Sequence, residues 1–489
     1  MQLRALIEGL ETFKVEGSLS AEVTGLAYEA RRVSAGDIYF ALQRGNSEGH
    51  SEIELAVERG AVAVVCRRNG TMRQRVTTIE VADTRAALAD VSAKFYGEAS
   101  EALRVIGVSG SGSAWKTAFL LNSILRASGV STGLISELRH EFGERRLPAG
   151  SALESCDVHR LFAEMVRAGC GTCVVQLPEI TLASMRGIPL DVLVLTADEQ
   201  NLWRLSEFMN QSTARRPSCG ILNVEKQDGR EAACAVLFDA HVTFGFSSAA
   251  QVSAQDVHYS TEATEGTLYI GNENVRFEVP LVGRENLTHL LAASAAAFAS
   301  DLTAEQIGGA LHELQTPPGS LEQVRTTQPF SVFVDEGRDE RSLEIALRSL
   351  REITTGRILL AFGAGEKTVG KERFGMGRVA AKYAQRIILT GDNPGREPVD
   401  QICGVIAQGI ESVGGMEYHF QPNRAEAIAE LTSMARAGDV LVISGKGDRV
   451  YQELANTIVP FDDKAIAAER LTALPTPRAR SQRRELVPA

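Results

Sequence analysis

The sequence of 489 residues has no apolar run near the roughly 20 residues that a membrane-spanning helix requires. Charged residues interrupt the apolar stretch at its start, so no signal peptide is expected. The net charge is -11 at pH 7, which argues against nucleic acid or an anionic membrane as the main partner. These absences indicate a cytoplasmic protein. Apolar residues make up 44% of the sequence, which is enough to build packed cores.

Cysteine is scarce, and its spacing does not indicate a disulfide framework. The seven cysteines are scattered, and the close pair Cys170 and Cys173 has no second pair at metal-site spacing. A redox motif is one interpretation of that pair. We favour the other, in which two small residues lead into a buried strand at Val174–Val175. A reducing compartment fits this usage.

The stretch 105–135 has the pattern of a phosphate-binding loop. An apolar strand at 105–108 is followed by a Gly/Ser loop, an apolar stripe at helical spacing and another strand at 132–135. Small residues let backbone N–H groups surround phosphate oxygens, and a helix N-terminus adds partial positive charge. The candidate nucleotide-binding residues here are Gly110, Gly112, Lys116 and Thr117.

One position of this loop departs from the general pattern G-x-x-x-x-G-K-[ST]. Trp115 stands where the second glycine is expected, and its side chain restricts the backbone and can crowd the phosphates. In the functional interpretation, Lys116 offsets the charge of the terminal phosphates of ATP and Thr117 binds Mg²⁺. In the alternative, this is a plain strand-to-helix turn with a solvated lysine. The residues leave both interpretations open.

The length predicts about three domains, and alternating strands and helices predict the α/β class. We expect domains at 1–100, 101–315 and 316–472, followed by a basic disordered tail at 473–489. The central domain should hold a mostly parallel sheet, and the C-terminal domain a doubly wound, Rossmann-like sheet with ligands at the carboxyl ends of its strands. The expected strands include 36–42, 61–65, 78–81, 173–177, 192–196, 220–223, 241–245, 267–270, 331–335, 357–362, 386–390 and 440–444. The expected helices include 53–59, 86–95, 289–299, 342–353, 378–384 and 424–437.

Several short motifs occur in a fixed order along the chain: Val33–Leu42, Gly49-His50, Gly60–Val65, Gly283–Leu287, Phe362–Gly365, Asp392–Pro394, Asn423–Ile428, Gly445–Gly447, Tyr451-Gln452 and Phe461–Asp463. The order of these motifs resembles that of the Mur ligases over nearly the whole chain except the tail. The class that it resembles most is MurE, the UDP-N-acetylmuramoyl-tripeptide synthetases.

The resemblance implies a defined chemistry in peptidoglycan precursor synthesis. ATP phosphorylates the terminal carboxylate of UDP-MurNAc-L-Ala-D-Glu, and the amine of a diamino acid attacks the acyl phosphate. The three domains would bind the UDP end of the precursor, ATP with Mg²⁺, and the amino acid. The implied site residues are Asn286 and Asp335 for the nucleotide, Asp392, Asn393, Arg396, Gly445 and Lys446 for the amino acid, and Arg31 for UDP. Lys116 and Glu179 are the catalytic candidates.

The departures from the family's motifs fall on polar residues. The family's strand-end carboxylate is Gln176 here, with Glu179 close by, and no lysine lies between Lys116 and Lys226, where the family has a carbamylated lysine. In the C-terminal domain, the family's D-Y-A-H is replaced by Asp335–Arg338, its G-D-R-D by Glu366–Val369 and its G-K-G-H-E by Gly445–Arg449. The family's D-N-P-R is replaced by Asp392–Gly395, with Arg396 one place late. Nearer the N-terminus, the family's D-S-R is replaced by Glu29–Arg31, and its T-N…D-H-L-D by Thr196-Ala197 and Gln200–Trp203.

Two functions therefore stay open. One is an active MurE-type ligase with a rearranged site. The other is a paralogue with little or no ligase activity that binds the nucleotide-linked precursor or scaffolds other cell-wall synthesis proteins. The second is favoured, because losing several charge-stabilising groups together leaves little of the rate. Which amino acid would be added is left open by the displaced Arg396.

Overall fold

The computed structural model describes residues 1–44, 47–67, 76–110, 112–149, 153–177, 182–196, 217–225, 238–414, 417–455 and 457–475. The chain divides into two compact units. Unit 1 is made of residues 1–255, 268–275 and 289–310, and unit 2 of residues 256–267, 276–288 and 311–489. Each unit is described below by itself. The predicted domain bounds at 100, 315 and 472 stay predictions.

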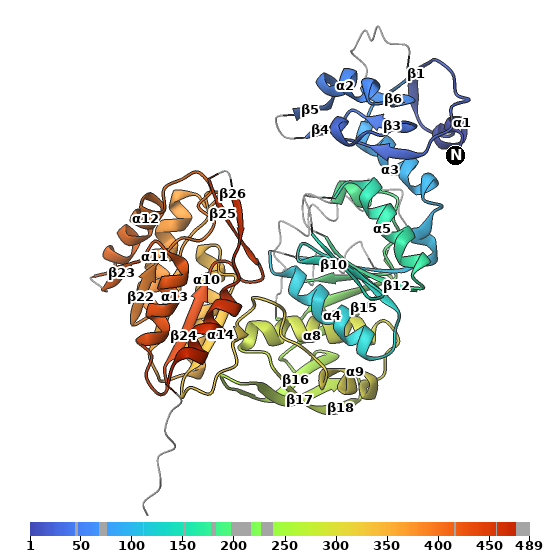
Figure 1. Cartoon of the computed structure of the whole chain (residues 1–489). Helices are drawn as coiled ribbons and strands as arrows, with labels where there is room; N and C mark the ends of the chain where they lie inside the picture. Colours follow the sequence, from blue (N-terminus) through green and yellow to red (C-terminus); the bar gives the residue numbers. More distant parts are fainter. Residues whose placement is uncertain are drawn as a thin grey trace, which may run out of the picture. The chain divides into compact units, whose positions relative to one another are not determined.

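The first part of unit 1 is a sheet in the order β1-β7-β6-β3-β2, parallel except for β1 (Figure 1). Alternating Ile38 and Phe40 of β3 pack on α3, whose N-terminus is capped by the Asp83 carboxylate. The elements here are α1 (Leu3–Ile7), β1 (Thr12–Glu16), β2 (Gly25–Ala27), β3 (Asp37–Phe40), β4 (Gln43–Arg44), β5 (Ser47–Glu48), α2 (Ile53–Glu58), β6 (Ala63–Arg67), β7 (Thr77–Val81) and α3 (Thr84–Phe95).

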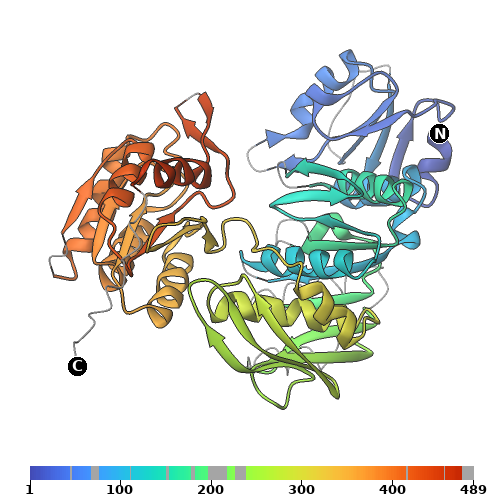
Figure 2. The same cartoon turned by 60° about the horizontal axis from the view of Figure 1, so that its bottom comes forward.

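The second sheet has eleven strands in the order β11-β10-β9-β12-β8-β13-β14-β15-β16-β17-β18. Its centre is parallel, as expected, and the antiparallel hairpin β10–β11 extends one side of it. The elements are β8 (Arg104–Ser109), α4 (Ala114–Ala127), β9 (Thr132–Ile135), β10 (Arg139–Phe142), β11 (Arg145–Pro148), α5 (Ser155–Arg167), β12 (Thr172–Leu177), β13 (Val192–Leu195), β14 (Cys219–Asn223), β15 (Ala240–Gly245), β16 (Val252–Tyr259), β17 (Thr264–Ile270), β18 (Glu273–Val279), α8 (Arg284–Phe298) and α9 (Ala304–Leu311). Long strands β16 to β18 run beside α8 and α9 in both views (Figures 1 and 2).

The third sheet, in unit 2, has the order β19-β20-β24-β21-β22-β23. From β20 to β23 every pair is parallel, which confirms the doubly wound prediction. The elements are β19 (Glu322–Gln323), β20 (Ser331–Asp335), α10 (Glu340–Ile353), β21 (Ile358–Phe362), α11 (Gly370–Tyr383), β22 (Arg386–Leu389), α12 (Val399–Glu411), β23 (Tyr418–Phe420), α13 (Arg424–Ser433), β24 (Val440–Ser444), β25 (Tyr451–Leu454), β26 (Thr457–Pro460) and α14 (Asp463–Ala473).

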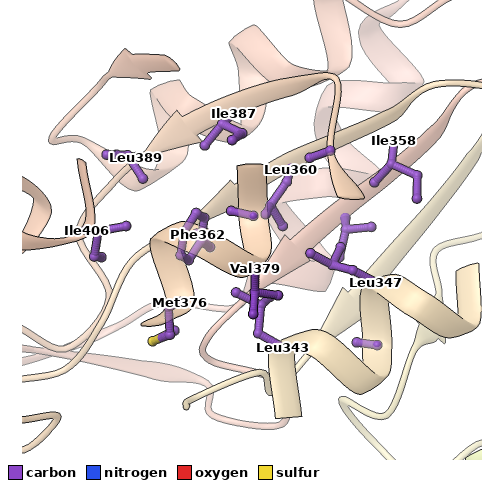
Figure 3. Packing of buried hydrophobic residues seen from close by; sticks show 14 of the residues in the cluster. Leu343, Leu347, Ile358, Leu360, Phe362, Met376, Val379, Ile387, Leu389 and Ile406 are labelled. Atoms are coloured by element: carbon purple, nitrogen blue, oxygen red, sulfur yellow. The ribbon is translucent and has the colours of Figure 1, made fainter. Parts of the chain in front are cut away.

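Alternate residues of this sheet serve two hydrophobic cores. Leu360 and Phe362 of β21 point to the face covered by α10, α11 and α12 (Figure 3). Leu359 and Ala361 point to the opposite face, which α13 and α14 cover. Because the strands are parallel and in register, their carboxyl ends at Asp335, Ser444, Phe362 and Leu389 lie along one edge.

Candidate functional site

The phosphate-type loop has the predicted strand-loop-helix setting: β8 ends at Ser109 and α4 begins at Ala114. Gly110 is required by close packing, because a Cβ there would lie 2.0 Å from Oγ1 of Thr196. That hydroxyl donates a hydrogen bond to the carbonyl of Ser109 at 3.1 Å. The loop is thus held against the end of β13, with Gly112 exposed to solvent.

Trp115 does not stand out into the loop. Its side chain is 2% exposed, so the protein interior takes up its bulk. The ammonium of Lys116, which is partly buried, lies 5.8 Å from the centroid of the indole ring, a distance at which a cation and an aromatic face attract. Lys116 therefore stays placed at the start of α4, where a phosphate charge would be offset.

Thr117 is fully buried. Its Oγ1 is 2.8 Å from Nδ1 of His289 on α8, a histidine that the sequence analysis did not single out. Gln176, at the position of the family's carboxylate, is also buried and accepts a hydrogen bond from the backbone N–H of Glu137 at 2.9 Å. Thr117 contacts His289, and Gln176 has a neutral amide where the family has a carboxylate, so these two residues bring no negative charge to a Mg²⁺ ion.

Glu179, the other metal candidate, lies outside the described residues, as does the segment 197–216. Within the described ranges no group of three or more His, Cys, Asp or Glu side chains is arranged to hold a metal ion. No helix in those ranges is long and apolar enough to cross a membrane.

In unit 2, two predicted nucleotide-binding residues hold the chain segment around Gly319 in place. The Asn286 amide donates to the carbonyl of Ser320, whose hydroxyl donates back to Asn286 Oδ1 at 2.7 Å. The Asp335 carboxylate accepts from the backbone N–H groups of Leu321 and Gly337 at 3.0 and 2.9 Å. Leu321 has φ of 49°, a left-handed conformation that costs energy in a leucine, so Asp335 stabilises a strained position.

The predicted amino-acid-binding motifs meet at the strand ends, as the parallel sheet requires. Lys446 is 0% exposed, and its ammonium donates to Oδ1 of Asn393 at 3.0 Å and lies 3.8 Å from Oδ1 of Asp392. Burial lowers the pKa of Lys446 to about 8, and the Asp392 carboxylate opposes that shift. Gly445 has φ of 121° and lies against Asp392. The motif is therefore joined internally by a buried lysine.

Arg396 is exposed, and the loop that carries it is fastened by Arg373, which the sequence analysis missed. Arg373 of α11 is 5% exposed and forms a two-pronged ion pair with Glu397 at 2.6 and 2.7 Å. It also donates to the carbonyls of Gly365 and Glu366. One arginine thus ties the loop after β21 to the loop after β22. The burial of this charged side chain in α11 is the feature that would have indicated its role in joining the two loops.

Two departures from the family's motifs pair with each other. Arg338 stands at the histidine of D-Y-A-H and Asp448 at the histidine of G-K-G-H-E, and their side chains form a hydrogen-bonded ion pair at 2.9 Å. Arg338 also donates to the carbonyl of Lys446 at 3.3 Å. Burial raises the pKa of Asp448, and Arg338 opposes that shift. The two exchanged residues connect the segments that follow β20 and β24.

The other residues that the sequence analysis singled out do not belong to the contacts described above. Arg31, proposed to meet UDP, is exposed in a short 3-10 turn at Ala30–Arg32 in unit 1. Cys170 and Cys173 are both free and buried, and burial raises the pKa of Cys173 well above its usual value, which fits a structural rather than a redox role. Among the predicted site residues that the structure describes, Gly110 and Lys116 are partly exposed, and Gly112, Arg31 and Arg396 are exposed.

Comparisons with known proteins place the chain among these ligases. The family described as Mur ligase, glutamate ligase domain, matches residues 321–447. The UDP-N-acetylmuramoyl-L-alanyl-D-glutamate--2,6-diaminopimelate ligase of Geobacter metallireducens is 31% identical over 496 residues, which cover 95% of this chain and 97% of that protein. A solved structure of a ligase of that name has a TM-score of 0.67 and 20% identity over 97% of this chain and 99% of that one. MurF of Thermotoga maritima in complex with ADP has a TM-score of 0.60 and 14% identity over 92% and 96%. The chain belongs to the Mur ligase family.

Proposed function

We propose that the protein is a MurE-type member that recognises UDP-MurNAc-L-Ala-D-Glu in peptidoglycan precursor synthesis. The observation that carries this proposal is the similarity to ligases named for that precursor, at 31% identity over 95% of the chain. A cytoplasmic location is part of the same proposal, and the described cysteines, all of them free, are consistent with it.

We further propose that ligation is much slower here than in the relatives, so that precursor binding is the main activity. The full burial of Thr117 and the neutral amide at Gln176 support this proposal. ATP would bind through the exposed loop and Lys116, and Mg²⁺, which in such ligases offsets charge on the transferred phosphoryl group, would meet the neutral amide of Gln176 in place of a carboxylate.

Titration of UDP-MurNAc-L-Ala-D-Glu into the full chain tests precursor recognition. We expect binding that Arg31→Ala weakens by about tenfold, the loss of one charge-assisted hydrogen bond, and that Arg32→Ala leaves unchanged. Arg32 is the matched control because it lies in the same exposed turn and pairs with Glu29 instead. Absence of binding up to millimolar concentration would rule out precursor recognition.

The second candidate function is that of an active ligase. Two observations favour it: the chain is similar over its full length to proteins that are named as ligases, and Arg396 is exposed. Phosphate release with the precursor, ATP, Mg²⁺ and a panel of amino acids separates the two. We expect release at background level for every amine, including 2,6-diaminopimelate. Turnover above background that requires one amino acid would establish the ligase and refute the slow-ligation proposal.

A further inference from the structure

Two polar contacts within unit 1 join the first sheet to helix α5, which packs against α3 (Figure 1). The Tyr28 hydroxyl donates a hydrogen bond to Oδ2 of Asp157 at 2.7 Å. The Arg85 guanidinium donates to both oxygens of the Glu154 carboxylate, at 3.1 and 2.9 Å. The partners are 129 and 69 residues apart in the sequence, so both contacts depend on how the two sheets are placed against each other.

On the side of the first sheet, the contacts begin where strands end. Tyr28 directly follows β2, and Arg85 also donates to the carbonyl of Gln43, just beyond the end of β3. Because β2 and β3 are parallel neighbours, their carboxyl ends lie at one edge, and such an edge is where parallel sheets bind ligands. Arg31, the residue proposed to meet UDP, lies three positions after Tyr28 in the same segment.

On the other side, both contacts end in the first turn of α5. Glu154 is the N-cap residue and Asp157 is at N3, and the two form a capping box that fixes the start of the helix. The side chain of Glu154 is 7% exposed, so the ion pair is partly shielded from solvent. Helix α5 leads into β12, and β12 pairs with β8, the strand that leads into the loop before Lys116. The first turn of α5 is therefore a fixed point of the part that carries the phosphate-type loop.

We propose that Tyr28 and Arg85 are positioning residues for the precursor, because they fix the predicted UDP-binding edge relative to the phosphate-type loop. This inference rests on the proposed recognition of UDP-MurNAc-L-Ala-D-Glu. The UDP end of that ligand would meet Arg31, and its D-Glu carboxylate has to reach the phosphates near Lys116. A ligand held at two points binds tightly only when the distance between them is already set, since less conformational freedom is then lost on binding.

Calorimetric titration of the full chain with two probes, UDP and UDP-MurNAc-L-Ala-D-Glu, tests the proposal. UDP needs only the first sheet, whereas the precursor needs both points. In Tyr28→Phe and in Arg85→Met we expect precursor binding to weaken by about 3- to 10-fold and UDP binding to change by less than about twofold. Arg85→Lys, which keeps the charge but not the two-pronged geometry, should restore part of the affinity. Arg145→Ala is the matched control, because Arg145 pairs with Glu164 of the same helix at 3.1 Å, and it should behave as the wild type.

Each result supports or overturns the proposal. Precursor affinity that is unchanged in both variants overturns it, and so does equal weakening of both probes, which would indicate a purely structural role. Thermal unfolding checks that the variants are folded, and Tyr28→Phe, which removes a single oxygen atom, carries the test if Arg85→Met is unfolded. If UDP binds too weakly to measure, weaker precursor binding in Tyr28→Phe but not in Arg145→Ala supports the proposal, and equal binding refutes it. A wild type that binds no precursor would refute the proposed function together with this inference, whereas a wild type that binds it as tightly as the variants do would refute this inference alone.

Discussion

Lys446 illustrates how a residue of a predicted ligand-binding motif is used inside the fold. Its ammonium is fully buried, bonds to Asn393 and lies 5.5 Å from the centroid of the Phe461 ring. The charged groups around it are Asp392, Arg424, Asp463 and Arg449. Burying an ammonium is costly even beside a carboxylate, so its charge is a source of pH-dependent stability.

The free energy of unfolding should rise with pH because of Lys446. The pKa is about 8 in the folded chain and 10.5 when unperturbed, so between these values the unfolded chain holds more protons and folding is favoured as pH increases. Relative to Lys446→Met, the wild type should gain about 3 kcal/mol from about pH 7 to about pH 10.5 in urea unfolding. The exposed Lys371→Met is the control. A constant difference between wild type and Lys446→Met would contradict this prediction.

Arg338 and Asp448 allow a second test at the scale of residues. Their side chains are 34% and 22% exposed, so the ion pair is only partly screened by solvent. In a double-mutant cycle with Arg338→Ala and Asp448→Ala, we expect a coupling of about 1–2 kcal/mol in the free energy of unfolding. Arg338→Lys should restore part of it. Additive single-variant effects would show that the pairing is incidental.

At the scale of elements, α11 and α12 pack so closely that glycine is needed at their crossing. A Cβ on Gly377 would lie 2.0 Å from the carbonyl oxygen of Ile406, and one on Gly409 would lie 2.0 Å from that of Phe374. Both clashes are with backbone, which cannot rotate away. The close approach explains why glycines, which are unfavourable inside helices, occur in both.

Gly409→Ala should therefore lower the free energy of unfolding by about 2–3 kcal/mol, the range expected for overpacking. Gly404→Ala is the matched control, because it lies in the same helix, α12, with open space around it. That substitution should stabilise by about 0.5–1 kcal/mol, since alanine favours the helix. Equal effects of the two changes in denaturant unfolding would mean that the helices are able to separate.

The elements that could be predicted are those whose apolar residues follow a simple period. β20 and β24 lie at 331–335 and 440–444, the predicted positions, because both are short apolar runs followed by turn residues. The helix expected at 378–384 in fact begins at Gly370, since its glycines hid the pattern and tertiary packing overrode their poor propensity. The polar hairpins β10–β11 and β25–β26 were missed, because their residues have no marked alternation.

The placement of the candidate site residues at one sheet edge could be predicted, but the direction of their side chains could not. Motif order placed Asp392, Asn393 and Lys446 together at one sheet edge, and the parallel register explains why. Their inward hydrogen bonds depend on residues distant in sequence, such as Glu453, whose N–H donates to Asn393. His289 and Arg373 were missed for the same reason: each acts through a contact that only the fold creates.

At the scale of the whole molecule, the two compact units share secondary structure. The boundary between them passes through β16, β17, β18, α8 and the last residue of α9, so each of these elements contributes residues to both units. A strand or helix loses its hydrogen-bonding cooperativity when half of it unfolds. The units should therefore unfold together.

Arg424→Met tests this coupling. Arg424 and Asp463 are both 0% exposed and paired at 2.6 Å, and Arg424 also donates to the carbonyl of Ser444. Removing the arginine leaves a buried carboxylate without its charge partner, which should cost about 3–5 kcal/mol. Because several elements are shared, calorimetry should show one unfolding transition that moves to lower temperature as a whole. Arg386→Met, at an exposed pair with Glu417, is the control and should cost less than about 1 kcal/mol. A second transition that stays at the wild-type temperature would show that unit 1 unfolds independently of unit 2.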